Sequence, residues 1–526
     1  MVSNAFERIP PLFLDLSKML AGEISCSSVD LEEYSSDGSP YTIIPQAVIY
    51  PKNVTDIRHV LSFAREYSMP VTVRGCGNSK LGGCLSEGIV LDMTRYFNNI
   101  RHISMVDNVV TVDAGVTVSE LTSRLDGWGF ELPPLLKSEE FTSVGGLFST
   151  RSVSPSTFFH GSIREWVEAL TVVVDNGEEH KIADGITPSG RLLGIYQSIF
   201  PILSKYGAQI RAAKPYSGED ATGYSIWNTS IGPRQLIDQL SGSEGTLGIV
   251  TSITFRLIPK RSQAIVTLIP VKEDDLPDII EAAKQTKADS LFLYDETFQT
   301  LCEKYHPGLL PAFVDCPYIL VAMHKDTDRE RLYDTVKHFK SELPAPEHLI
   351  KSSDDEKRFL RIMSQDFLHS LLAMYSKSAL TPLSSTEGGI VKVGDLPRYI
   401  KDVVTYIHHE GRVSTVTGCV GSGHLAVTSL LDPYSRLYSN DITEYQEGVF
   451  SLLKKYRGGI SASGGDGLSR TPYLSYCYSE VSLSLFEDIK RAWDPTTVLN
   501  PGKKINVSLN YLNQHLHAPK FSTGKP

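Results

Sequence analysis

Residues 70–83 read P-V-T-V-R-G-C-G-N-S-K-L-G-G, a short apolar strand that runs directly into a glycine-rich loop. Glycines allow positive φ and let a backbone approach a ligand closely. Successive bare N–H groups form a concave nest for anions. Arg74 adds a positive charge and Ser79 adds a hydroxyl donor. The loop therefore suits a pyrophosphate, although a plain turn between two strands would have the same composition.

Two common phosphate-binding motifs are excluded at this loop. The P-loop needs Gly-Lys-Ser/Thr, which is absent, and the dinucleotide fingerprint G-x-G-x-x-G needs a third glycine where Lys80 stands. The flanking pattern nevertheless predicts alternating strands and helices. Ala47–Tyr50 and Ile89–Met93 read as strands, and Val54–Tyr67 has helical apolar spacing between them. This order fits α/β or α+β layering and allows parallel strand pairing.

A second block begins near Lys260. Strands are expected over Ala264–Pro270 and Ser290–Tyr294, and helices over Asp274–Thr286 and Leu396–His408. This order is typical of an α+β sandwich.

Four further segments accompany the glycine-rich loop. In chain order they are T142-S-V-G-G146, H160-G-S-I-R-E165, S241-G-S-E-G-T-L-G-I-V250 and N500-P-G-K503. Their order and spacing resemble the FAD-binding family named after vanillyl-alcohol oxidase and p-cresol methylhydroxylase. The resemblance covers residues 43–505, and its combination of motifs is far more specific than any one of them.

The resemblance implies an α+β fold with a two-subdomain FAD-binding domain and a ferredoxin-like cap. The boundaries expected from it are a lead-in over 1–42, the FAD-binding domain over 43–260 and the cap over 261–469. A C-terminal segment over 470–510 would return to the FAD-binding domain, and 511–526 would form a loose tail.

The resemblance also implies which residues hold FAD. Arg74, Gly75, Gly77, Asn78, Ser79 and Gly82 would cradle the pyrophosphate, and Gly145 and Gly146 would close it from the other side. Gly161, Ser162 and Ile163 would lie along the cofactor. Glu244, Gly245, Ile249 and Val250 would hold its adenine–ribose end, with Asn500 near the flavin ring. Relatives with covalent flavin often place a histidine where Asn78 stands, so we expect non-covalent FAD.

Within the family, the chain looks most similar to the D-lactate dehydrogenase and glycolate oxidase flavin-subunit branch. Active members of that branch carry G-H-x-G-D-G-N-x-H and E-H-G, which supply a divalent metal site and a histidine base. Here Cys419 and Ala426 replace the two metal-binding histidines, and Ser463 and Gly464 replace the glutamate and the base. No metal site is therefore expected.

His424, Arg470 and Tyr473 are the catalytic candidates that remain. His424 lies in the glycine-rich turn that faces the substrate in relatives, and it could accept a proton. Arg470 would suit a carboxylate through its planar fork, or could instead pair with Asp466. A packed or solvated loop histidine is the simpler interpretation of His424.

The residues thus favour an FAD-dependent oxidoreductase that oxidises a small hydroxy acid or alcohol by hydride transfer without a metal. A flavin-binding protein with a degenerate site and an accessory role is the main alternative. A lyase or synthase-like use of flavin, as in the ether-lipid synthase branch, ranks lowest because that branch's His-rich stretch is absent.

Composition sets the remaining limits. Fifty-one Lys+Arg against 61 Asp+Glu give a net charge of −10, with no long basic run, so nucleic acid is not expected as a partner. Seven dispersed cysteines without C-x-x-C favour a reducing, cytoplasmic location. The sequence contains no apolar run that is long enough to predict an integral membrane segment. The sequence contains no Fe–S cysteine cluster, so it does not indicate which electron acceptor the protein uses. The oligomeric state is also not indicated by the sequence.

Overall fold

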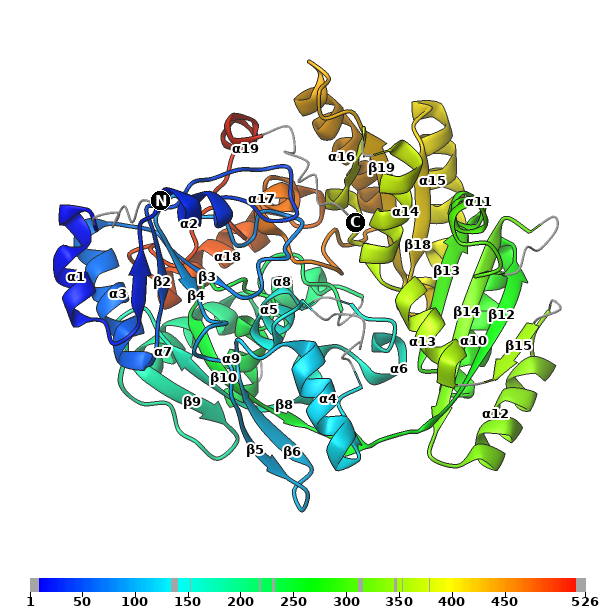
Figure 1. The fold of residues 1–526 in the computed structure, drawn as a ribbon, viewed down its shortest axis with the longest axis horizontal. Helices are drawn as coiled ribbons and strands as arrows, with labels where there is room; N and C mark the ends of the chain where they lie inside the picture. The colour runs from blue at the N-terminus through cyan, green and yellow to red at the C-terminus, as the bar shows by residue number, and fades with distance from the viewer. Residues whose placement is uncertain are drawn as a thin grey trace, which may run out of the picture.

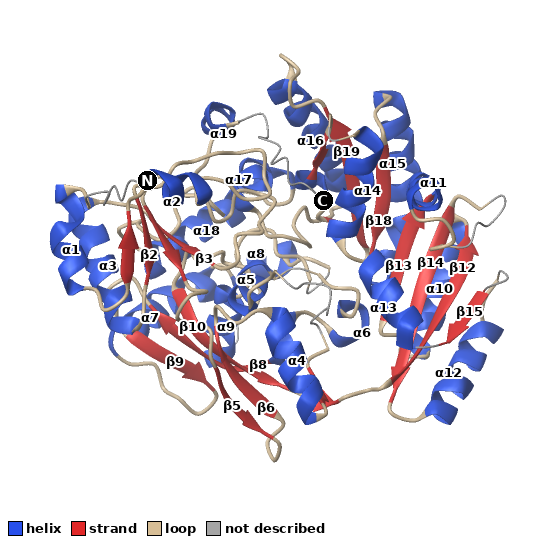
Figure 2. Ribbon diagram, in the orientation of Figure 1, coloured by secondary structure: helices blue, strands red, loops and turns tan. Residues whose placement is uncertain are grey.

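A computed structural model describes residues 9–133, 141–151, 153–216, 219–228, 232–310, 316–344, 348–351, 353–377 and 379–516. Figure 1 shows two large bodies: the N-terminal half together with the C-terminal helices, and a cap built from the middle of the chain. Figure 2 shows helices and strands mixed in both bodies. The predicted α+β class with a separate cap is confirmed.

The first sheet carries the glycine-rich loop. Its order is β1-β2-β4-β3. The strands are β1 (Glu23–Ser25), β2 (Ala47–Tyr50), β3 (Val71–Arg74) and β4 (Ile89–Asp92). Strand β4 pairs in parallel with both β2 and β3, as the order of elements in the sequence allows, and β1 pairs antiparallel with β2. Residues of the expected lead-in thus form part of this sheet.

Helix α3 (Val54–Tyr67) makes the crossover between β2 and β3, and it buries Ile57, Val60, Leu61 and Ala64 against the sheet. Asn53 caps its first turn by accepting from the N–H of Asp56. Helices α1 (Leu14–Met19) and α2 (Ser28–Glu33) belong to the N-terminal segment. Phe13 and Leu16 of that segment pack into the same core.

The second subdomain is a five-stranded antiparallel sheet of order β5-β6-β10-β8-β9. Its strands are β5 (Ile100–Ser104), β6 (Val109–Asp113), β8 (Val167–Val173), β9 (Glu179–Ala183) and β10 (Ile249–Arg256), with a separate pair β7 (Phe130–Glu131) and β11 (Ile258–Pro259). The helices of this part are α4 (Val118–Trp128), α5 (Val144–Thr150), α6 (Thr157–His160), α7 (Gly190–Lys205), α8 (Gly207–Ala213) and α9 (Pro233–Leu240).

The C-terminal segment returns to the second subdomain. Its helices are α17 (Gly467–Arg470), α18 (Glu480–Trp493) and α19 (Leu509–His515). Phe486, Ile489 and Trp493 of α18 complete the core of the second subdomain. Leu512 of α19 packs with Tyr41 and Ile43, so the part of the expected tail up to residue 516 is helical and packed. The rest of that tail lies outside the described residues.

The cap is one antiparallel sheet with helices on both faces. Its strands are β12 (Gln263–Val271), β13 (Ser290–Asp295), β14 (Tyr318–Asp326), β15 (His348–Lys351), β16 (Thr381–Leu383), β17 (Gly389–Ile390), β18 (Ser414–Gly418) and β19 (His424–Leu431). The order is β15-β12-β14-β13-β18-β19-β16, and β17 pairs with β19. Its helices are α10 (Leu276–Gln285), α11 (Glu296–Tyr305), α12 (Arg329–Ser341), α13 (Ser353–Ile362), α14 (Gln365–Ser376), α15 (Leu396–Glu410) and α16 (Tyr438–Lys455).

Alternating strand residues divide the cap into two cores. In β13, Leu291 and Leu293 face α10, α15 and α16, whereas Phe292 and Tyr294 face α11, α13 and α14. This period of two is what a sheet buried on both faces requires. The face that carries Phe292 is the one turned toward the FAD-binding half, because Phe292 borders the cavity described next.

Candidate active site

One cavity of about 400 Å³ joins the glycine-rich loop to the cap. Residues from 73–84, 141–150 and 244–250 line it from one side, and residues from 363–366, 417–426 and 463–470 line it from the other. Most of the predicted FAD-binding residues meet here. They are Arg74, Gly75, Gly77, Asn78, Ser79, Gly145, Gly146, Glu244, Gly245, Ile249 and Val250.

The glycine-rich loop presents backbone donors to this cavity. Within the described residues, the N–H groups of residues 75–80 donate no hydrogen bond to the protein. The loop is held open by its side chains instead. Ser79 Oγ accepts from the N–H groups of Leu81 and Gly83, each at 3.2 Å, and Asn78 Nδ2 donates to Thr142 Oγ1 at 2.8 Å.

The cavity wall is open at Gly245. A Cβ on Gly245, whose φ is +72°, would meet only Val73, at 3.7 Å, so it would project into the cavity. Bare N–H groups facing a glycine-lined hollow are the donor set that a diphosphate needs. The residues present therefore fit the phosphate part of FAD.

Arg74 has a different role from the one predicted. Its guanidinium donates to the carbonyl oxygens of Tyr34 and Ser36, at 3.3 and 3.1 Å, and lies over the Tyr34 ring. Arg74 thus fastens the N-terminal segment beside the glycine-rich loop, and its donors are not directed at a phosphate.

Glu244 joins the S-G-S-E-G-T motif to the C-terminal segment. Its carboxylate accepts from the N–H groups of Asp466 and Gly467, at 2.7 and 2.9 Å, and lies 3.1 Å from Lys504 Nζ. Lys504 also lies 2.8 Å from the Asp466 carboxylate. Burial raises the pKa of Glu244, and Lys504 opposes that change. This buried cluster fixes the loop at residues 463–467 against the FAD-binding half.

Asn500 does not line the cavity but forms hydrogen bonds with the loops that do. Its Nδ2 donates to the carbonyl oxygens of Gly83 and Glu244, at 3.0 and 2.7 Å, and its Oδ1 accepts from Thr72 Oγ1 at 2.9 Å. The N-P-G-K motif therefore ties the glycine-rich loop to the Glu244 turn.

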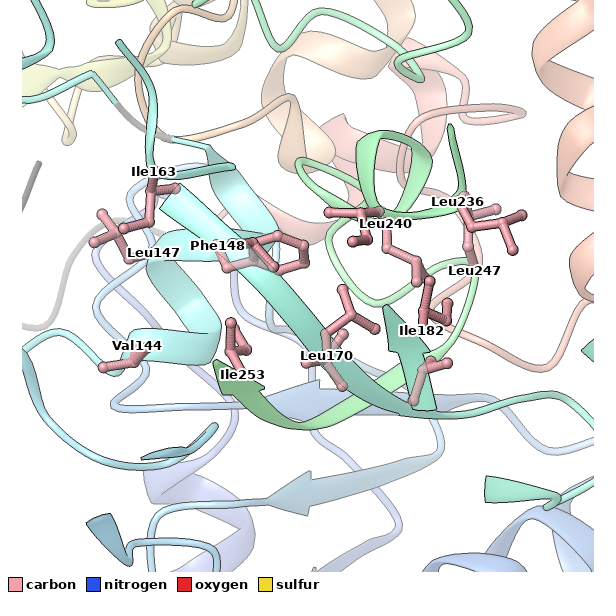
Figure 3. Close-up of a cluster of buried hydrophobic side chains, with 14 of the residues drawn as sticks. Val144, Leu147, Phe148, Ile163, Leu170, Ile182, Leu236, Leu240, Leu247 and Ile253 are labelled. Carbon is pink, nitrogen blue, oxygen red and sulfur yellow. The ribbon is translucent and has the colours of Figure 1, made fainter. Parts of the chain in front are cut away.

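Besides Asn500, four other predicted FAD-binding positions do not line the cavity: Gly82, Gly161, Ser162 and Ile163. A Cβ on Gly82 would meet Leu468. Ile163 packs beside Leu147 in the core of the second subdomain, as Figure 3 shows. These residues shape the walls of the site from outside it.

His424 lines the cavity, as predicted, but both ring nitrogens are engaged. Its Nε2 lies 2.9 Å from the carbonyl oxygen of Glu387, and its Nδ1 accepts from the N–H of Cys419 at 3.4 Å. These partners assign the proton to Nε2. Burial lowers the pKa of His424 to about 4. The ring is therefore neutral and packed, and its lone pair is not available as a base.

Arg470 and Tyr473 also differ from their predicted roles. Arg470 is buried at the cavity edge, and its guanidinium donates to the carbonyl oxygens of Ser384, Ser385, Ser463 and Gly465. It braces two loops of the cap, and Asp466 pairs with Lys504 instead. Tyr473 packs with Phe450 and Tyr476 in the cap core, away from the cavity.

Sequence reasoning missed the charged groups on the cap side. Glu387 lines the cavity, and its Oε1 lies 2.6 Å from Nε2 of His369, on α14. Lys80, from the glycine-rich loop, pairs with Asp366 of α14 at 3.0 Å across the cavity rim. Among the described residues, no group of three or more His, Cys, Asp or Glu side chains is arranged to hold a metal ion.

Comparison with known families agrees with this geometry. Residues 45–183 match the FAD binding domain, and residues 261–504 match the C-terminal domain of FAD linked oxidases. The two matches together cover most of the chain. It therefore belongs to the FAD-linked oxidases of the vanillyl-alcohol oxidase type, as the motifs predict. FAD is the cofactor of this family, and the cavity fits it.

Curated relatives are distant in sequence. The chain is 25% identical over 518 residues to D-2-hydroxyglutarate dehydrogenase of Pseudomonas putida, with 92% of this chain but only half of that protein covered. It is 25% identical to glycolate oxidase subunit GlcD of Bacillus subtilis, covering 89% of this chain and 91% of that one. A D-lactate dehydrogenase of Anaerostipes hadrus is 24% identical, with 87% and 89% covered. The resemblance to this branch is confirmed.

Solved structures confirm the fold. The 4-ethylphenol oxidase of Gulosibacter chungangensis superposes with a TM-score of 0.68 at 16% identity, covering 94% of this chain and 96% of that one. An alkyldihydroxyacetonephosphate synthase superposes with a TM-score of 0.63 at 14% identity, covering 94% and 85%. Among the described helices, none is long and apolar enough to cross a membrane.

Proposed function

We propose that this protein oxidises the CH–OH group of a small hydroxy acid or alcohol, with hydride transfer to non-covalent FAD and without a metal. The observation that carries the proposal is the single cavity that joins the glycine-rich loop to ionisable cap residues. Its relatives are named for oxidation of D-2-hydroxyglutarate, glycolate and D-lactate. The domain boundaries predicted above and a cytoplasmic location belong to this proposal.

When bound, FAD supplies the hydride acceptor. The protein positions the cofactor and the substrate and supplies the polar and charged groups around them. Glycines 75, 77, 145, 146 and 245 line the cavity, a Cβ on Gly245 would meet only Val73, and Asn500 and Lys504 hold the surrounding loops. On the cap side, Phe292 and Met363 are apolar walls, and Lys80 of the glycine-rich loop is the lining cation that we assign to a substrate carboxylate. Such a carboxylate would take the place of Asp366 beside Lys80.

A flavin-binding protein without redox activity is the second candidate. It is favoured by the engagement of His424 and Arg470 with backbone groups, because neither offers a free polar atom to a substrate. An anaerobic absorption spectrum separates the two functions. The purified protein should show a flavin spectrum that bleaches with one member of a panel of D- and L-2-hydroxy acids and simple alcohols. A bound flavin that dithionite reduces, but no member of the panel bleaches, would favour the second candidate.

A further inference from the structure

Glu387 is a buried residue whose two hydrogen-bond donors both contact the same carboxylate oxygen, which leaves the other oxygen without a donor from the part of the chain that the structure describes. The residue is 2% exposed and lines the cavity just after the turn at Ser384–Thr386. Oε1 accepts from His369 Nε2 at 2.6 Å and from Thr428 Oγ1 at 2.8 Å. Within the described residues, no donor reaches Oε2. Because Glu387 lines the cavity while both of its hydrogen-bond donors contact Oε1, Oε2 is the oxygen left for a ligand hydroxyl.

The surroundings keep this carboxylate charged. Burial alone would raise its pKa, but His369 of α14, Lys80 of the glycine-rich loop and the hydroxyl of Thr428 lower it to about 2. The other charged groups nearby are Asp366, which pairs with Lys80, and Arg470, which is occupied by carbonyl oxygens. His424 of β19 is neutral at physiological pH. Glu387 is thus an ionised acceptor that lines the cavity and, unlike Asp366, forms no ion pair with Lys80.

We propose that Glu387 is the catalytic residue that accepts the substrate's hydroxyl proton, and that His369 is its positioning residue. This inference rests on the proposed function. In the step, the C–H bond breaks and its electron pair leaves with the hydride for the flavin. The O–H bond breaks as well, its proton passes to Glu387 Oε2, and its electron pair forms the carbonyl of the product. His369 holds Oε1 by donating from Nε2, which leaves Oε2 directed at the substrate.

The geometry also explains how a weakly basic carboxylate can serve. The hydroxyl becomes strongly acidic as the hydride departs, so the acceptor needs correct placement more than a high pKa. A carboxylate that stays ionised across the physiological range gives a proton-transfer step that does not weaken at mildly acidic pH. Glu387 and His369 thereby replace the metal ion and histidine base of active relatives, which the residues at 419, 426, 463 and 464 cannot provide.

The test compares E387Q with a matched control, D289N. Asp289 also forms a buried ion pair with a histidine, His160 at 3.0 Å, but it does not line the cavity. Glutamine keeps a hydrogen-bond acceptor near the substrate and removes the proton acceptor. We expect E387Q to retain FAD and to bind the substrate with a Kd within about tenfold of wild type, since general-base loss acts on the chemical step. The substrate is whichever panel compound bleaches the wild-type flavin, and Kd is taken from the dependence of the single-turnover reduction rate on substrate concentration.

Flavin reduction by E387Q in a single turnover should be about 100-fold slower or more. H369Q should be slowed less, and D289N should match the wild type. Reduction of E387Q within fivefold of the wild-type rate would overturn the proposal, as would a weaker Kd that accounts for the whole loss. If E387Q does not hold FAD, E387D is the second variant. It keeps the charge and withdraws the oxygens by one methylene, and an unchanged rate in E387D would overturn the proposal equally. Failure of the wild type to bleach with any compound counts against the proposed function instead.

Discussion

Lys504 Nζ lies 3.1 Å from the Glu244 carboxylate, and both side chains are almost completely buried. The contact joins two motifs from opposite ends of the FAD-binding half, since Glu244 precedes β10 and Lys504 follows the N-P-G-K segment. Lys504 also neutralises Asp466, and it donates to the carbonyl oxygens of Ala221 and Gly223. One ammonium group therefore holds four chain segments around the cavity.

Replacing this ammonium should destabilise the fold strongly. K504M leaves Glu244 and Asp466 as buried carboxylates without their cation, and loss of one partner of a buried ion pair typically costs about 3–5 kcal/mol. Urea unfolding followed by circular dichroism measures the change. The control is K18M, which removes an exposed ion pair with Asp15 and should leave the midpoint unchanged. Equal midpoints for the two variants would contradict the role given to Lys504.

Asn500 should control cofactor retention. N500A frees the buried carbonyl oxygens of Gly83 and Glu244 and leaves each without its donor, at a cost of about 1–3 kcal/mol. Because those carbonyls belong to the two loops that form the FAD cavity, we expect FAD to dissociate roughly tenfold more readily. Fluorescence of released flavin during dilution gives the value. N513A, which removes an exposed contact with Ser439, should behave like the wild type.

Tyr473 should be dispensable for flavin reduction. Its hydroxyl is 3.4 Å from Gln446 Oε1 inside the cap core, and the ring packs against Phe450. Y473F keeps the ring and removes only a weak hydrogen bond. We expect an unchanged bleaching rate and nearly unchanged stability. A large loss of bleaching rate with intact stability would restore the catalytic role that the sequence predicted.

His424 should make the protein sensitive to acid. Its pKa is about 4 in the folded protein, against about 6.5 in an unfolded chain, so the unfolded state binds one more proton between these values. The free energy of unfolding should therefore fall as the pH is lowered from about 6.5 to 4. H424Q should remove this contribution and make the pH dependence shallower, by up to about 1.4 kcal/mol per pH unit.

A second buried histidine provides the comparison for this effect. Burial also lowers the pKa of His324 to about 4, and that ring lies in the cap with Nε2 3.0 Å from Thr286 Oγ1. H324Q should produce a similar change in slope, and the two changes should add because the rings share no partner. Unfolding measured at several pH values would contradict this explanation if neither variant altered the slope.

Local sequence patterns predicted several of the elements, and most of the residues proposed to hold FAD line one cavity. Ala47–Tyr50 and Val54–Tyr67 form the expected strand and helix with the expected bounds. The glycine-rich loop directly follows strand β3, the Glu244 motif leads directly into strand β10, and the two segments line one cavity. These signals are local, since apolar spacing and glycine runs act over a few residues.

The cap side could not be predicted in the same way. Nothing in the spacing of His369 and Glu387 indicates their contact, because one lies on α14 and the other follows a separate turn. Glu387 lies in a short T-E-G-G segment, and only its burial beside the cavity makes its carboxylate significant. His424 and Arg470 were placed correctly at the cavity, but the main-chain partners that occupy them are set by tertiary packing.

The most direct test of the central claim is single-turnover bleaching of the bound flavin, without oxygen, by a 2-hydroxy acid carrying hydrogen or deuterium on the hydroxyl-bearing carbon. The account predicts that one such acid bleaches the flavin and that deuterium slows the bleaching severalfold, because the C–H bond breaks in the same step. A flavin that dithionite bleaches, but that no hydroxy acid or alcohol of the panel reduces, would contradict it.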